Sequence, residues 1–478
     1  MESASLILPS VVVSENHINN SSWTVVLLIN TMLGAGIFAQ AAVFKEAGVL
    51  GATILLLVFS YVAWYSATVV IEIAAVISTE DQVFDTYSKI IGHVLGPWGS
   101  CILNASIIVS LIGAMLSYMV VIGYESSSMI VDADSDTNDL FFIILFVVTI
   151  CVVLPPCLLF RRYHSFTLLS AFSVAAIVCI VSFVLATSWY EREETYIGDA
   201  RDYDSDYKET VRWIDAGGMI RNTGTTFFAM GFTYAANHAY NGLKFETPGR
   251  SYGTYKPNQE RSLYDLDNLR QWRKVSGVAV GICAGLLFAC GLPGYLAFRD
   301  ATSGELLDNW ESTYSYPFKT LLVIHLVLYI PPEVAIWRVC WDWFFTKKRA
   351  RDETVMDFAY VGTTCGYVFG TMSLAMIFYA NGWSEGDAFK IILNVAGAIC
   401  APWIANILPA LAVLKISGQT SFLTPLLGPP YEGKVDFQRL GTDGDEMVTD
   451  WVRMAWFNLI LGTFLILQEL CFLVKKVS

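Results

Sequence analysis

Long apolar stretches recur along most of the chain and are separated by shorter polar segments. A helix needs about 20 mainly apolar residues to cross a bilayer, and eleven stretches meet this requirement. They cover residues 23–43, 50–77, 99–123, 140–159, 166–188, 219–241, 276–298, 318–341, 356–380, 388–414 and 451–474. Apolar and polar residues do not alternate within them, which argues against the strands of an outer-membrane barrel. The pattern predicts an all-α membrane protein with 11 transmembrane helices.

The composition agrees with this class. Hydrophobic residues make up 55% of the 478 residues and charged residues 15%, which is too apolar for a soluble protein of this length. The net charge of −13 falls largely in two acidic segments, 132–139 and 191–210, which we interpret as solvated loops, so no nucleic-acid partner is expected. Neither a nucleotide-binding loop, a catalytic triad nor a metal-ligand spacing is found, so we predict no enzyme activity and no metal site.

Basic residues gather in the loops that follow even-numbered spans, at 161–162, 244–274 and 347–351. Because short cytoplasmic loops retain Lys and Arg, we expect these loops and the N-terminus on the cytoplasmic or matrix side. The first 22 residues lack the basic start and the cleavage-type ending of a signal peptide. The sequence does not distinguish between the plasma membrane, the vacuolar or lysosomal membrane and the mitochondrial membrane as the location.

Two predicted spans carry polar residues and glycines where a membrane helix normally has apolar residues. In the first, Asn30, Thr31, Gly34 and Gly36 lie near the middle of the span, and in the sixth the segment 224–246 reads "GTTFFAMGFTYAANHAYNGLKFE". Unwound backbone at membrane depth is tolerated only where it is buried in protein or lines a cavity, and transporters bind substrate at such breaks. The alternative is that the glycines only let a neighbouring helix approach closely.

Six segments resemble the amino acid/auxin permease family in the family's order and spacing, over nearly the whole chain. They are "NTMLGAGIFAQAAVFKEAG" (30–48), "IGAMLSYMVVIG" (112–123), "VLPPCLLFRR" (153–162), "FTYAANHAYNGLKFE" (232–246), "CGLPGYLAFRDATSGELLDNW" (290–310) and "ILNVAGAICAPWIANILPALAVLKI" (392–416). Within that family, the pattern is most similar to the neutral and proton-coupled amino acid transporters.

The resemblance implies a secondary active amino acid transporter that works by symport and alternating access. The implied fold is a five-plus-five inverted repeat, LeuT-like, with broken first and sixth helices. Its implied parts are an N-terminal tail (1–22), a first repeat (23–188), an acidic outer loop (189–218), a second repeat (219–414), an inner loop (415–450) and the eleventh span with the C-terminus (451–478).

The resemblance also implies which residues bind the substrate. The candidates are Asn30, Thr31, Met32, Gly34, Ala35, Gly36 and Ile37 on the first span, Tyr118 on the third, and Phe228, Gly231, Phe232 and Tyr234 on the sixth. The chemistry agrees with this placement, because a carboxylate suits the amides at a helix N-terminus and an ammonium suits the carbonyls at a C-terminus.

Glu333, His238 and Asn30 are candidates for ion coupling. An ionisable residue inside a span is costly and is a functional candidate for that reason, and histidine titrates near physiological pH. The alternatives are that Glu333 pairs with Arg338 or with backbone freed by the two prolines before it, and that the histidine is structural. Tyr329 stands where sodium-coupled relatives tend to carry Thr, so H⁺ is favoured over Na⁺ as the driving ion. No cofactor is expected.

Two departures from the family pattern leave a second hypothesis open. Ala41 replaces a common Pro, and "ANH" at 236–238 replaces a more usual Gly-His-Asn order. A protein that retained the fold but lost transport would serve as a subunit of a membrane complex, with other membrane-protein chains as partners, or as a nutrient sensor. Otherwise the expected partners are an amino acid substrate and the lipid bilayer.

Overall fold

The computed structural model describes most of the predicted spans and few of the long loops. The described residues are 19–78, 84, 86–130, 138–190, 211–244, 264, 266–304, 306–310, 312–345, 358–381, 396–419, 429, 431–433, 435–440 and 444–477. In these ranges the secondary structure is helical apart from one isolated bridge between Asn19 and Leu243. The predicted all-helical membrane fold is therefore confirmed, whereas the acidic segment 191–210 lies outside the described residues.

Nine helical segments of the described chain are long and apolar enough to cross a membrane. Seven contain a single long helix each, namely α3 (Val49–Ile77), α5 (Pro97–Ser128), α8 (Thr167–Tyr190), α11 (Leu266–Phe298), α12 (Ser312–Phe345), α13 (Phe358–Ala380) and α17 (Gly444–Val477). The other two contain π-helical turns: α6 (Asn138–Val148) continues through Thr149–Val153 into α7 (Leu154–Leu159), and the turns Ala396–Cys400 and Trp403–Ile407 lead into α15 (Leu408–Ile416).

Prolines explain where these π-helical turns fall. Each of the three turns is followed within two residues by a proline, the first by Pro155, the second by Pro402 and the third by Pro409. A proline has no N–H and its ring crowds the preceding turn, so the helix there widens to keep its remaining hydrogen bonds.

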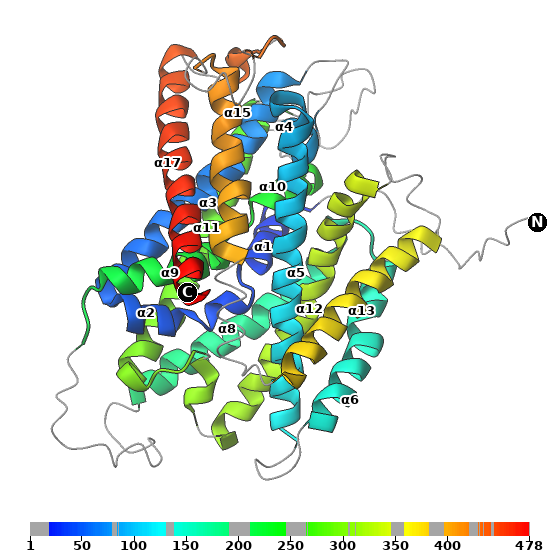
Figure 1. The fold of residues 1–478 in the computed structure, drawn as a ribbon, viewed down its shortest axis with the longest axis vertical. Coiled ribbons are helices and arrows are strands. Elements are labelled where there is room, and N and C mark those ends of the chain that lie inside the picture. The colour runs from blue at the N-terminus through cyan, green and yellow to red at the C-terminus, as the bar shows by residue number, and fades with distance from the viewer. Residues whose placement is uncertain are drawn as a thin grey trace, which may run out of the picture.

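The two remaining predicted spans, 23–43 and 219–241, are each broken into shorter helices. The first consists of α1 (Ser21–Met32), a one-turn helix at Ala35–Ile37 and α2 (Gln40–Ala47), and the second of α9 (Ala216–Met230) and α10 (Thr233–Gly242). In Figure 1, α1 and α10 lie in the middle of the bundle, between α15 with α17 on one side and α12 with α13 on the other. The breaks predicted from the glycines and polar residues are present.

The halves of the two broken helices pack crosswise. Helix α1 contacts α10, and α2 contacts α9. At the first contact the backbone N–H of Asn19 donates to the carbonyl of Gly242 at 2.8 Å, and the N–H of Lys244 donates to the carbonyl of Asn19 at 2.7 Å. The start of one broken helix is therefore tied to the end of the other.

A buried ion pair joins α3 to α11. Nε of Arg273 donates to Oε1 of Glu72 at 2.6 Å, and the Glu72 side chain is 6% exposed. On the same helix, Arg270 pairs with Asp267 at 3.7 Å, but both of these side chains are more than half exposed. The two arginines therefore provide a buried pair and a matched exposed pair.

Arg273→Ala is expected to lower the free energy of unfolding by about 3 kcal/mol or more, because it leaves the Glu72 carboxylate buried without its partner. The control Arg270→Ala should cost about 1 kcal/mol or less, since exposed pairs contribute little. Thermal unfolding of the detergent-solubilised protein measures both. Equal effects of the two substitutions would contradict this account of the Glu72 pair.

Candidate functional site

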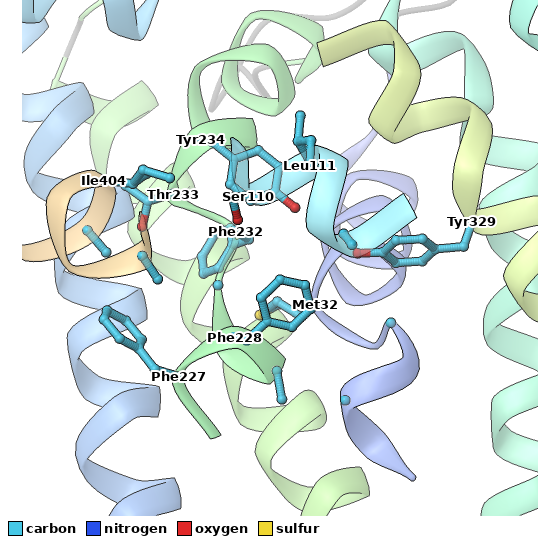
Figure 2. Close-up of a pocket in the computed structure, with 17 residues that line it drawn as sticks. Met32, Ser110, Leu111, Phe227, Phe228, Phe232, Thr233, Tyr234, Tyr329 and Ile404 are labelled. Carbon is cyan, nitrogen blue, oxygen red and sulfur yellow. The ribbon is translucent and has the colours of Figure 1, made fainter. Parts of the chain in front are cut away.

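A cavity lies where the two broken helices face each other. The space there that protein atoms do not fill, including the opening, is about 550 Å³. Tyr329 enters from one side, and Phe227, Thr233 and Ile404 lie on the other (Figure 2). The lining residues are Met32, Gly34, Gly36, Ser110, Leu111, Ala114, Phe227, Phe228, Ala229, Gly231, Phe232, Thr233, Tyr234, Tyr329, Ala401, Ile404 and Ala405.

Three helix ends meet at this cavity. Helices α1 and α9 both end here, at Met32 and Met230, and α10 begins here at Thr233. A helix C-terminus leaves carbonyls without intrahelical partners and an N-terminus leaves N–H groups, with partial charges of opposite sign. The Thr233 hydroxyl is buried and has no hydrogen-bond partner among the described residues. The cavity can therefore receive a positive group and a negative group at separate places.

Glycine is required at the first break because residues on other helices approach its backbone closely. A Cβ on Gly36 would lie 2.8 Å from the Cβ of Ala229 and 3.1 Å from its Cα. A Cβ on Gly34 would collide with the hydroxyl of Tyr118 and lie 3.2 Å from the ring of Tyr329. The alternative interpretation of these glycines, close helix approach, is thus also correct, and it operates at the same residues as the break.

Seven of the predicted substrate residues line the cavity together. They are Met32, Gly34 and Gly36 from the first broken helix and Phe228, Gly231, Phe232 and Tyr234 from the second. Four others, Asn30, Thr31, Ile37 and Tyr118, are buried but do not line it. The side chain of Ala35 lies outside the described residues.

Asn30 and Thr31 point away from the cavity, toward the start of α8. The amide of Asn30 donates to the Ser170 hydroxyl at 3.2 Å, and the Thr31 hydroxyl is hydrogen-bonded to both Tyr163 and the carbonyl of Leu27, the latter at 3.0 Å. The Asn30 side chain therefore bonds to α8 and the Thr31 side chain to the turn that precedes α8, while only their backbone belongs to the break.

Side chains on α5 and in the segment 396–416 also line the cavity but were not singled out from the sequence. They are Ser110, Leu111, Ala114, Ala401, Ile404 and Ala405. All are small or aliphatic residues of the kind found throughout membrane helices, so no sequence signal marks them.

Glu333 lies directly behind the cavity wall. Its carboxylate accepts hydrogen bonds from the Tyr234 hydroxyl at 3.1 and 3.2 Å, and the residue is 3% exposed. Tyr234 itself lines the cavity, so one hydroxyl separates the carboxylate from whatever the cavity holds. Within the described residues no ion pair to Glu333 is found.

Arg338 is not the partner of Glu333, which excludes one of the two alternatives for this carboxylate. Its guanidinium donates to the carbonyl of Cys157 at 2.7 Å, to the Tyr360 hydroxyl at 2.6 Å and to the carbonyl of Phe160 at 3.2 Å. Arg338 therefore caps the C-terminal end of α7, where carbonyls lack helical partners.

His238, the other predicted titratable group, lies outside the cavity lining. It is half-buried on α10, with its ring centroid 6.2 Å from that of Tyr163. The structure thus separates the three ion-coupling candidates: Glu333 adjoins the wall, Asn30 faces α8, and His238 lies farther along α10.

These features define a multi-pass membrane protein with a cavity at the break of two helices. Over residues 19–236 and 260–424, well over half of its length, the chain matches the family described as transmembrane amino acid transporter protein. The chain belongs to this family, and the resemblance to the amino acid permeases is confirmed.

Individual relatives are distant. The chain is 25% identical to the amino acid transporter AVT6C of Arabidopsis thaliana, covering 66% of this chain and 70% of that one. It is 21% identical to the putative sodium-coupled neutral amino acid transporter 10 of Xenopus laevis and to the human solute carrier family 38 member 10, covering 83% of this chain in both cases. It spans only about a third of the length of these two animal relatives. Among solved structures, a mutant manganese transporter of Eremococcus coleocola overlays with a TM-score of 0.49 at 12% identity, over 95% of this chain and 97% of that one.

Proposed function

We propose that this protein is a secondary active transporter that moves neutral amino acids together with protons by alternating access. In this proposal the chain forms two inverted five-helix halves followed by an eleventh helix, with the N-terminus on the cytoplasmic or matrix side. The observation that carries it is the cavity formed at two opposed helix breaks, with a carboxyl residue immediately behind its wall.

The helix ends suit the zwitterionic part of an amino acid. The carboxylate would lie at the N–H groups where α10 begins, near the unpartnered Thr233 hydroxyl, and the ammonium at the carbonyl end of α1. No described lining residue carries a charge, and three are phenylalanines. This lining favours a neutral, partly apolar side chain, because a charged one would be desolvated without a partner.

Glu333 supports H⁺ as the driving ion. A carboxylate inside a span with hydroxyl partners but no cation is costly, and taking up a proton removes that cost. When protonated, its O–H can donate to Tyr234, so proton binding and the shape of the cavity wall are linked through one hydrogen bond. The name of the frog relative includes sodium, so Na⁺ is the ion against which this proposal is tested.

Purified protein in vesicles is expected to accumulate a radiolabelled neutral L-amino acid when an inward proton gradient is imposed. A gradient of about one pH unit supplies roughly 1.4 kcal/mol per proton, enough for about tenfold accumulation in one-to-one symport. Each L-amino acid is tested in turn, with an equal inward Na⁺ gradient at uniform pH as the second condition.

Accumulation with Na⁺ alone would contradict proton coupling but retain the carrier. Absence of uptake under every gradient, together with thermal stabilisation by an amino acid, would support the nutrient-sensor hypothesis instead, because a ligand that binds the folded state stabilises it by mass action.

A further inference from the structure

The side chain of Tyr329 joins α12 to the break in the first broken helix. The residue is buried and lines the cavity (Figure 2), and its hydroxyl donates to the backbone carbonyl of Thr31 at 2.7 Å. Its ring packs edge-on against that of Tyr118, with the ring centroids 5.1 Å apart. Tyr329 is therefore held in place by its ring, while its hydroxyl bonds to the break.

The carbonyl of Thr31 has lost its helical partner at this break. Helix α1 ends at Met32, and the last bond at its end runs from the N–H of Leu33 to the carbonyl of Ile29 at 2.9 Å. In a continued α-helix the Thr31 carbonyl would accept from the N–H four residues later, but the chain there has turned into a separate one-turn helix. The Tyr329 hydroxyl supplies the missing donor. It thereby fixes the last turn of α1, whose carbonyls are the proposed site of the substrate ammonium.

The same hydroxyl also interacts with Glu333, which lies one helical turn beyond Tyr329 on the same face of α12. Tyr234 donates to this carboxylate at 3.1 and 3.2 Å, and Tyr329 contributes a further hydrogen-bond interaction to it. A tyrosine hydroxyl has a single proton, so Tyr329 cannot donate fully to Thr31 and to Glu333 at the same time. The direction of that one bond therefore depends on which acceptor is stronger.

The protonation of Glu333 decides which acceptor is stronger. An ionised carboxylate accepts stronger hydrogen bonds than a neutral carbonyl does, so it draws the Tyr329 hydroxyl away from Thr31. A protonated carboxyl group has lost this advantage, and it leaves the hydroxyl to the Thr31 carbonyl. In the structure the hydroxyl donates to Thr31, which is the arrangement that a protonated Glu333 favours.

We propose that Tyr329 is the positioning residue that couples proton binding at Glu333 to the end of α1. This inference rests on the proposed proton-coupled function. With Glu333 protonated, Tyr329 orders the last turn of α1, and an ordered turn binds the substrate ammonium more tightly because less ordering is needed on binding. The Thr31 carbonyl has two lone pairs, so it can accept from the tyrosine and from the ammonium together. By linkage, bound substrate also favours the proton on Glu333, so the two bind and leave together.

The titratable groups that act on Glu333 from neighbouring elements are tyrosines. Helix α1 contributes no titratable residue. The tyrosines are Tyr118 from α5, Tyr163 from the turn before α8, Tyr234 from α10 and Tyr367 from α13. Since a phenol keeps its proton at physiological pH, the residue of this cluster that exchanges a proton is Glu333.

Other charged groups on the elements packed against α12 are bound elsewhere. Glu125 on α5 and Asp308 on the one-turn helix Leu306–Asn309 both pair with Lys319, at 3.0 and 2.7 Å. Arg338 binds the end of α7. None of these described groups is a competing partner of the Glu333 carboxylate in the structure.

Hydrogen exchange of the detergent-solubilised, full-length protein tests this coupling without substrate. The parent protein is compared with Glu333→Gln, Tyr329→Phe and the double variant at one pH. Glutamine is a neutral acceptor, so Glu333→Gln should leave the Tyr329 hydroxyl to Thr31. At about pH 9 we expect amides in residues 29–37 to exchange at least about threefold more slowly in Glu333→Gln than in the parent, and this difference to vanish when Tyr329→Phe is also present.

The matched control is Tyr264→Phe. It also removes a buried phenolic hydroxyl that donates to a backbone carbonyl, that of Phe84, but it is not among the residues that line the cavity. In the presence of Tyr264→Phe, Glu333→Gln should still slow exchange in residues 29–37 by the same factor. If the slowing also persists with Tyr329→Phe, the inference is overturned even where uptake is proton-driven.

Substrate affinity gives a second readout. The probe is the L-amino acid that gives the parent protein the largest thermal stabilisation. The parent is expected to bind it at least about fivefold more tightly at about pH 5 than at about pH 9, whereas Tyr329→Phe should bind it weakly, with affinities within about twofold of each other at both pH values. The same pH dependence in both proteins would overturn the inference and leave the proposed function intact. If uptake by the parent is not proton-driven, the proposed function fails, and hydrogen exchange still decides whether Glu333 and Tyr329 act together on the break.

Discussion

Gly36→Val is expected to weaken substrate binding and uptake by about tenfold or more. The added side chain would enter space occupied by Ala229 on the opposing broken helix, whose Cβ and Cα would lie only 2.8 and 3.1 Å from the new Cβ. Backbone at both breaks would have to separate, which changes the cavity that the two breaks form. Overpacking of this kind costs about 1–3 kcal/mol, and a loss of about tenfold or more in binding follows, because every 1.4 kcal/mol is tenfold.

The control for this substitution is Gly281→Val on α11. A Cβ at Gly281 has no heavy atom within 4 Å, so the same change in side chain meets open space. Binding is measured by thermal stabilisation with each amino acid, and uptake is measured in vesicles. Parent-like uptake by Gly36→Val would show that the contact between the breaks does not shape the binding site.

Glu333→Gln is expected to remove proton-driven accumulation while leaving substrate exchange in place. The amide has nearly the same size as the carboxyl group and can still accept a hydrogen bond from Tyr234, but it cannot bind or release a proton. With a gradient of about one pH unit, accumulation should fall from about tenfold to none. Exchange should persist, because it requires binding and movement but no net proton transfer.

The matched control is Asp300→Asn, which removes a carboxylate that is exposed on the one-turn helix Arg299–Ala301. Accumulation should not change in this variant. If the Glu333→Gln variant still concentrates substrate under a proton gradient, Glu333 is not part of the coupling mechanism. Loss of exchange as well as accumulation would assign the residue to substrate binding or to folding instead.

The membrane class, the positions of the apolar helices and the two breaks could all be predicted from the amino-acid sequence. These properties are local: about 20 apolar residues satisfy the length of a span, and glycines with polar neighbours weaken the helix where they occur. Seven predicted substrate residues meet at the cavity for the same reason, since they lie in or beside the breaks. The family followed from short motifs that are also local in the chain.

Which polar groups meet could be seen only once the helices were packed together. Tyr234 and Glu333 are 99 residues apart, and the pairing of His325 with Ser173 spans 152 residues. Asn30 and Thr31 belong to the break in sequence, yet the Asn30 side chain bonds to Ser170 on α8 and the Thr31 side chain to Tyr163 just before it. Partnerships of this kind depend on how helices from distant parts of the chain pack, which the spacing of apolar residues along each helix does not encode.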